Sequence, residues 1–197
     1  TLNLFTFHII PQLNPDGAKA YTRLNANQFD LNRDSIKLSQ PESKLLHTEY
    51  DRIEPDYALN LHGQRTIYGA GVNGGPATLS FLSPSANPER SITPARKIAM
   101  SAIASIYNSM REELPLGIGR YDDTFNPNCF GDTFQTLRTP TILFESGHYK
   151  NDYNRENVRK YMCLAQISAI ISVSSNSFLQ YCHSDYYQIK ENGRHNP

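Results

Sequence analysis

The feature that most constrains the fold is an alternation of short apolar runs with longer segments of helical period. The apolar runs that read as strands are residues 57–61, 78–82 and 140–144. The helical patterns cover residues 39–53, 93–114 and 154–174. Buried strands that alternate with helices are typical of α/β proteins, in which helices cover both faces of a sheet. We therefore expect an α/β fold built on a three-layer mixed β-sheet with helices on both faces.

A further apolar run opens the sequence. Residues 2–10 are rich in β-formers and are closed by Pro11 and by the Asn-Pro-Asp-Gly turn at 14–17. We expect a strand here that already lies inside a sheet, so that the chain starts within a fold. A length of 197 residues then predicts a single, partial domain over residues 1–197.

The charge balance excludes two classes of partner. Lys and Arg number 19, as do Asp and Glu, so the formal net charge is zero. A neutral chain lacks the electrostatic attraction that binders of nucleic acids and anionic membranes use. No apolar run approaches the length of a membrane-spanning helix. We expect neither a nucleic-acid partner nor a membrane span.

The cysteines and the sequons say little about the compartment. Cys129, Cys163 and Cys182 are odd in number and lack C-x-x-C spacing, so we interpret them as buried free thiols. No Asn-x-Ser/Thr sequon occurs, which is compatible with an intracellular or bacterial protein and proves neither. The compartment stays open, with the cytoplasm slightly favoured over the periplasm or secretion.

Two polar side chains stand at the C-terminal ends of expected strands, where ligands of open α/β sheets gather. His62 follows the strand at 57–61, and it either serves as a metal ligand or catalyst or bonds a neighbouring carbonyl. Glu145 follows the strand at 140–144. Partial desolvation there raises the pKa of a carboxyl towards the range of a general base, and the alternative is an ion pair with a nearby arginine.

The loop after residues 14–17 is rich in arginine and asparagine. These residues are Arg23, Asn25, Asn27, Asn32 and Arg33. Two guanidinium groups with side-chain amides form a plausible receptor for a carboxylate or an oxyanion. The alternative is local pairing of the arginines with Asp30 or Asp34.

Residues 69–74 match the pattern G-x-G-x-x-G. A dinucleotide site needs a strand before this pattern and a helix after it, whereas Gly75-Pro76 and a strand follow here. We interpret the segment as a loop without a cofactor.

The order of these motifs resembles one known family. The motifs are Asn-Pro-Asp-Gly (14–17), Arg23, Asp-Leu-Asn-Arg-Asp (30–34), Leu-His-Gly around His62, and a strand ending in Glu145. They resemble the zinc carboxypeptidases, peptidase family M14, over roughly residues 1–165. The resemblance is greatest to bacterial M14-like peptidases whose loop runs R-x-N-A-N-x-x-D-L-N-R. It implies a zinc-carboxypeptidase-like fold and a metallocarboxypeptidase that removes the C-terminal residue of a peptide.

The resemblance also implies catalytic and metal-binding roles. His62 would bind one Zn²⁺ ion, Glu145 would act as general base and then general acid, and Arg23 would polarise the scissile carbonyl. Catalytic zinc sites use three protein ligands, and the family supplies the other two from an H-x-x-E motif that this sequence lacks. We expect those two ligands upstream of residue 1. The alternative is a natural loss that leaves a non-catalytic fold.

Substrate contacts follow from the same resemblance. Asn32 and Arg33 would hold the terminal carboxylate of the substrate, and Tyr121 would cap the substrate. The segment 128–132 would line the specificity pocket. Asp132 in this segment either selects a basic side chain or caps the turn at 133–137.

Two other functions remain open from the sequence. One is zinc-dependent deacylation of N-acyl amino acids, as in aspartoacylase-like enzymes, because Asn32 and Arg33 would serve either carboxylate equally. The other is a catalytically inactive module that binds C-terminal carboxylates through Arg23 and Arg33. The expected ligand is thus a peptide or an N-acyl amino acid, and the sequence leaves the oligomeric state open.

Overall fold

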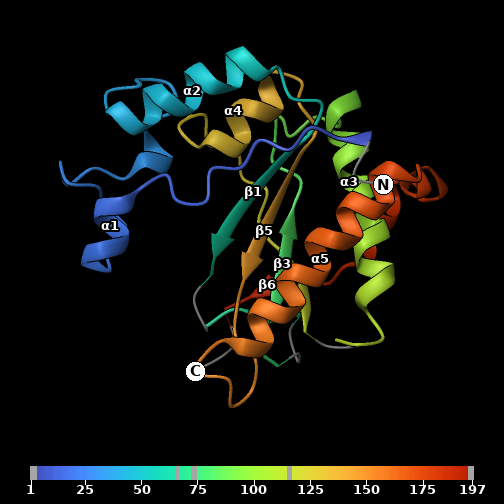
Figure 1. Ribbon diagram of the computed structural model, residues 1–197. Coiled ribbons are helices and arrows are strands. Elements are labelled where there is room, and N and C mark those ends of the chain that lie inside the picture. The colour runs from blue at the N-terminus through green and yellow to red at the C-terminus, as the bar shows by residue number, and fades with distance from the viewer. Residues whose placement is uncertain (1–3, 65–66, 72–74, 115–116, 195–197) are drawn as a thin grey trace.

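The computed structural model describes residues 4–64, 67–71, 75–114 and 117–194 (Figure 1). Its strands are β1 (Ala58–Gly63), β2 (Gly69–Ala70), β3 (Leu79–Leu82), β4 (Ile118–Arg120), β5 (Thr141–Ser146) and β6 (Asn192–Gly193). Its α-helices are α1 (Pro15–Ala20), α2 (Pro41–Ile53), α3 (Pro94–Met110), α4 (Phe130–Thr136) and α5 (Glu156–Ser174). Short 3₁₀ helices are η2 (Leu31–Arg33), η3 (Ser177–Gln180) and η4 (His183–Gln188).

The main sheet is mixed and has four strands in the order β1-β5-β3-β4. β1 is parallel to β5 and β3 is parallel to β4, while β3 and β5 are antiparallel. β2 and β6 form a separate antiparallel pair. The expected α/β class and the mixed sheet are confirmed.

Side chains alternate between the two faces of the sheet, as the pleat requires. On β5, Ile142 and Phe144 are fully buried in the hydrophobic core beneath α3 and α5. Leu143 and Glu145 point to the other face, where Gly131 of α4 packs near Leu143. Figure 1 shows α3 and α5 along one side of the sheet, with α2 and α4 near the end at which β1 and β5 begin. Helices therefore lie on both faces.

The strand expected over residues 2–10 is wrong for its described part. Residues 5–10 have no regular structure, and Phe7 and Ile9 are 45% and 76% exposed. A strand needs a neighbouring strand to pair its backbone groups. No described strand pairs with residues 5–10, so their β-forming sequence stays unpaired. Residues 2 and 3 lie outside the described residues.

Other expectations hold with shifted boundaries. The strands at 57–61, 78–82 and 140–144 and the three long helices are present. Thr93 caps α3 through its bond with the amide of Arg96. Gln40 is the N-cap residue of α2, and Ser39 donates to Asp34. The short helix α1 and the strand β4 were not expected, because each is too short to show a period.

The three cysteines are free, as expected, but none of them is fully buried. Cys129 is partly exposed, and Cys163 and Cys182 are exposed on the surface. Within the described part of the chain, no helix is both long enough and apolar enough to cross a membrane.

The first prediction concerns the core between the sheet and its helices. Phe144 is fully buried and lies edge-on to Phe81, with 5.4 Å between the ring centroids. We expect Phe144→Ala to lower the free energy of unfolding by about 3–5 kcal/mol, because it leaves a cavity. Tyr153→Ala is the control, since Tyr153 is 89% exposed, and a change of about 0.5 kcal/mol or less is expected there. Urea denaturation measures both, and equal losses would contradict this account of the core.

Candidate active site

The parallel pairing of β1 with β5 places His62 beside Glu145. The two residues are register partners, and Ser80 of β3 is the partner of Glu145 on its other side. Register partners on neighbouring strands point to the same face and lie about 5 Å apart. Two residues that are 83 positions apart in the sequence thus meet at one edge of the sheet.

Burial sets the charge states of both side chains. Burial raises the pKa of Glu145 to about 7, although the charge of Arg23 acts in the opposite direction. Burial also lowers the pKa of His62, and the charge of Arg23 lowers it further. Near neutral pH, His62 is therefore neutral, while Glu145 exists in both protonation states. This combination suits a metal-ligating imidazole beside a general base.

Each of these side chains has a buried polar atom without a hydrogen-bond partner. The atoms are Nε2 of His62 and Oε2 of Glu145. Buried polar atoms are nearly always paired, so two unpaired atoms on adjacent residues indicate a place for a ligand.

A zinc ion fits this place only in part. A neutral His62 with a free Nε2 is a suitable single ligand. Among the residues that the structure describes, however, no group of three His, Cys, Asp or Glu side chains is arranged to hold a metal ion. The described residues therefore offer one zinc ligand and do not complete a zinc site.

Arg23 is held near this pair by the Asn-Pro-Asp-Gly turn. Asn14 accepts a hydrogen bond from the amide of Gly17 (2.9 Å) and donates one to the carbonyl of Arg23 (3.4 Å). A Cβ atom on Gly17 would lie 2.3 Å from the Asn14 amide nitrogen and 2.7 Å from the Leu24 carbonyl oxygen. Only glycine fits there, so the turn residues of the motif fix the backbone that carries Arg23.

Asp30 links Arg23 to the second half of the loop. Its carboxylate accepts from Nε of Arg23 (2.7 Å) and from the amide of Asn32 (3.0 Å). The local pairing of arginine with Asp30 that the sequence left open is therefore present. The Arg23 side chain is 59% exposed, and its bond with Asp30 is made through Nε.

Asn32 and Arg33 lie together against the start of α4. The side-chain oxygen of Asn32 accepts from the amide of Phe130 (3.1 Å). Arg33 is exposed and donates to the carbonyl of Asn32 (2.5 Å) and to Sγ of Cys129 (3.0 Å). The contact with Cys129 was not expected from the sequence, because 96 residues separate the two.

Tyr121 lies on the same side of the sheet as Glu145. The charge of Glu145 contributes to the raised pKa of Tyr121, after burial and a hydrogen bond with Tyr68. The rings of Tyr68 and Tyr121 are tilted, with 5.3 Å between their centroids. Tyr68 belongs to this cluster, but no sequence motif pointed to it.

The remaining asparagines of the loop have a structural role. Asn25 is buried, donates to Gln40 (3.0 Å) and accepts from the amides of Asn27 and Phe29. Asn27 also donates to Gln40 (2.9 Å). Their side chains hold the loop together and are not free to bind a substrate.

Asp132 lies in the first turn of α4 and is buried. It accepts from the amide of Asn126 (3.0 Å), and burial raises its pKa to about 6. Its carboxylate therefore holds the segment before α4. The expected cap over 133–137 is wrong, because Asp132 lies inside α4 and the N-cap residue of this helix is Cys129.

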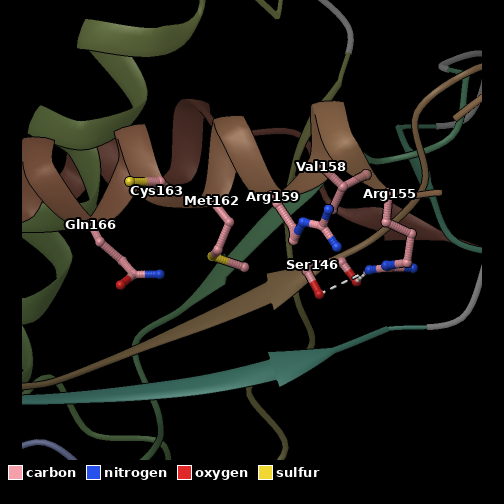
Figure 2. A pocket seen from close by; sticks show the side chains of 7 residues that line it. All are labelled: Ser146, Arg155, Val158, Arg159, Met162, Cys163 and Gln166. Carbon is pink, nitrogen blue, oxygen red and sulfur yellow. Dashed lines mark hydrogen bonds between the residues drawn. The ribbon is translucent and has the colours of Figure 1, made fainter. Parts of the chain in front are cut away.

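A separate pocket of about 340 Å³ lies on the opposite face of the sheet, beside α5. Figure 2 shows Met162 and Gln166 reaching from α5 towards the sheet, and Arg155 donating to Ser146. Ser146 follows Glu145 directly, and successive residues of a strand face opposite sides of the sheet. This pocket is distinct from the site at His62 and Glu145.

The second prediction uses the raised pKa of Glu145. The folded state binds the Glu145 proton more tightly than the unfolded state, so wild-type stability falls as the pH rises from about 4.5 to about 7. Glu145→Gln removes this loss. In metal-free protein, we expect the variant to gain up to about 3 kcal/mol over wild type across this range. Urea denaturation at pH 4.5, 6 and 8 measures the difference, with exposed Glu112→Gln as the control. If the free energies of unfolding of Glu145→Gln and of wild type changed equally with pH, the pKa of Glu145 would not be raised.

Known proteins that resemble this chain are carboxypeptidases, matched over a part of their length. No family model matches the sequence. Carboxypeptidase SOL1 of Arabidopsis thaliana is 41% identical over 66 residues, which is 28% of this chain and 13% of the plant protein. Carboxypeptidase 2 of Trichophyton tonsurans and that of Trichophyton equinum are each 35% identical over 54 residues, which is 27% of this chain and 10% of the fungal protein. The matched segments thus span about a tenth of these relatives, and they support a relationship to carboxypeptidases at the level of the segment.

Proposed function

We propose that this chain is part of a zinc-dependent carboxypeptidase of the M14 type, which removes C-terminal residues from peptides. The observation that carries the proposal is the pairing of His62 with Glu145 across β1 and β5, each with an unpaired buried polar atom. The partial similarity to carboxypeptidases supports the same function.

Glu145 is the proton carrier in this proposal. With a pKa of about 7, its carboxylate can accept a proton from the attacking water and return it to the leaving amine at neutral pH. Nε of Arg23 stays bonded to Asp30, while its terminal nitrogens would approach the substrate. Its guanidinium group would stabilise the oxygen on which negative charge develops.

His62 would contribute one zinc ligand through Nε2, and the residues that the structure describes do not supply the other two. When bound, a zinc ion polarises the scissile carbonyl and lowers the pKa of water. Burial keeps His62 neutral, which is the form that binds metal.

Asn32 and Arg33 hold the terminal carboxylate of the peptide. Arg33 is exposed, and its present partners are a carbonyl oxygen and a thiol, which are weaker acceptors than a carboxylate. A carboxylate can therefore replace them. Tyr121, whose pKa the charge of Glu145 helps to raise, would cover a bound substrate.

Two alternatives share this site and differ in the reaction. A deacylase would use the same residues on N-acyl amino acids, so parallel assays with peptides and N-acyl amino acids distinguish the two enzymes. An inactive module would bind carboxylates without metal and without hydrolysis. We favour the peptidase, because burial has tuned Glu145 to the range of a general base.

The third prediction tests the role of Glu145 in the full-length protein. We expect Glu145→Gln to lower kcat for peptide hydrolysis by about 10²- to 10⁴-fold, because the general base is lost, while peptide binding persists. Steady-state kinetics and calorimetric binding measure the two effects, and exposed Glu112→Gln is the matched control. Unchanged hydrolysis by Glu145→Gln would end the proposal. Binding without hydrolysis or metal in the wild type would favour the inactive module.

The fourth prediction tests the carboxylate receptor. We expect Arg33→Ala to raise KM for peptides with a free C-terminus by about 10- to 100-fold, because a bond to a charged group is lost. Arg33→Lys keeps the positive charge but cannot form two parallel hydrogen bonds with a carboxylate. We therefore expect its KM to lie between those of wild type and Arg33→Ala. Peptides with an amidated C-terminus should show no further loss in either variant. If Arg33→Ala raises KM equally for peptides with a free and with an amidated C-terminus, Arg33 does not bind the carboxylate.

A further inference from the structure

Arg96 is a buried charged residue that the proposed reaction does not use. It lies in the first turn of α3 and is 0% exposed. Its guanidinium group forms an ion pair with Asp123 and donates to the carbonyl of Arg90 (2.5 Å). A fully buried charge is costly unless it is paired, so this position demands an explanation.

Asp123 is the point at which several contacts meet. Besides Arg96, its carboxylate accepts from Arg90 (3.1 Å), and its carbonyl accepts from the hydroxyl of Ser85 (2.7 Å). Burial raises the pKa of Asp123, but the hydrogen bonds and charges of Arg96 and Arg90 outweigh this effect and hold the pKa below its usual value. The carboxylate thus stays ionised near neutral pH.

Tyr121 lies two residues before Asp123, directly after β4. Its amide donates to the carbonyl of Phe81 on β3 (2.9 Å). The short segment from Tyr121 to Asp123 is therefore fixed at one end to the sheet and at the other end to α3. Between these two anchors, the Tyr121 ring packs against the ring of Tyr68, with 5.3 Å between the centroids, and the charge of Glu145 contributes to its raised pKa.

We propose that Arg96 is a positioning residue that, through Asp123, fixes Tyr121 beside Glu145 for contact with the substrate. This inference rests on the proposed function, in which Tyr121 covers the substrate. Arg96 acts from the helical layer behind the sheet and does not touch the reacting atoms. A purely structural ion pair would hold α3 and the loop together without affecting Tyr121.

The first experiment is a double-mutant cycle in the full-length protein. Arg96→Met with Asp123→Leu replaces the ion pair by apolar side chains, a change that buried pairs often tolerate. Tyr121→Phe is introduced into wild type and into this background, and kcat and KM are measured for a peptide. We expect Tyr121→Phe to lower kcat/KM by about tenfold in wild type and by less than about twofold without the ion pair.

Stability and a matched surface arginine provide the controls. Thermal unfolding shows whether the paired substitution folds, and if it does not, Asp123→Asn carries the same cycle. Arg96→Lys keeps the charge and should recover a part of kcat/KM. Arg159→Met removes an exposed arginine of α5 that pairs with Glu156, and it should leave kcat/KM unchanged. If Tyr121→Phe lowers kcat/KM equally in wild type and in the variant without the ion pair, the inference is overturned and the ion pair has only a structural role.

A second readout separates this inference from the proposed function. The ring signals of ¹³C-labelled tyrosine are assigned to Tyr121 by their loss in Tyr121→Phe. We expect the Tyr121 signal to shift in the variant without the ion pair and to stay in place in Arg159→Met. If the Tyr121 signal has the same chemical shift in wild type and in the variant without the ion pair, the inference is overturned. If wild-type protein hydrolyses no peptide while the signal shifts, the proposed function is wrong and the positioning of Tyr121 by Arg96 stands.

Discussion

The parallel pairing of β1 with β5 is the constraint on which the candidate site depends. A shift of one residue in its register would turn His62 or Glu145 to the opposite face, because side chains alternate along each strand. The core opposes such a shift, since Ile142 and Phe144 are fully buried beneath α3 and α5. Glu145 lies on the other face of β5, where its own burial raises its pKa to about 7. Packing on one face of β5 therefore fixes the register that places His62 and Glu145 side by side on the other.

Two buried ionisable groups, Arg96 and Glu145, differ in how their charges are balanced. Arg96 is paired with Asp123, which balances its charge, although its Nε has no hydrogen-bond partner. Oε2 of Glu145 is also unpaired, and the charge of Arg23 only partly offsets the burial that raises the pKa of Glu145 to about 7. In the first loop, Asp30 joins Arg23 to Asn32. A loop that is braced internally can present the terminal nitrogens of an arginine without a long helix or strand to support it.

Much of the fold could be predicted, because its long elements carry a clear period. The three long helices and the strands that end near His62 and Glu145 follow from apolar spacing and from proline and glycine signals. The segment 5–10 was misread, because strand formation depends on a partner and β-propensity records only the local preference. The exposure of Cys163 and Cys182 was also misread, since average burial of a residue type does not fix any one position.

The sequence by itself indicated the long helices and three strands, with His62, Glu145, Arg23, Asn32 and Arg33 as candidate residues. Local chemistry is sufficient for these, because strand ends and turns are encoded in neighbouring residues, whereas Tyr121 was named only through the resemblance to a known family. Only the tertiary structure decided the partners, such as Cys129 for Arg33, Tyr68 for Tyr121 and Asp123 for Arg96. These contacts join residues that are 27 to 96 positions apart. They depend on how helices and strands pack, and no local pattern in the sequence encodes that packing.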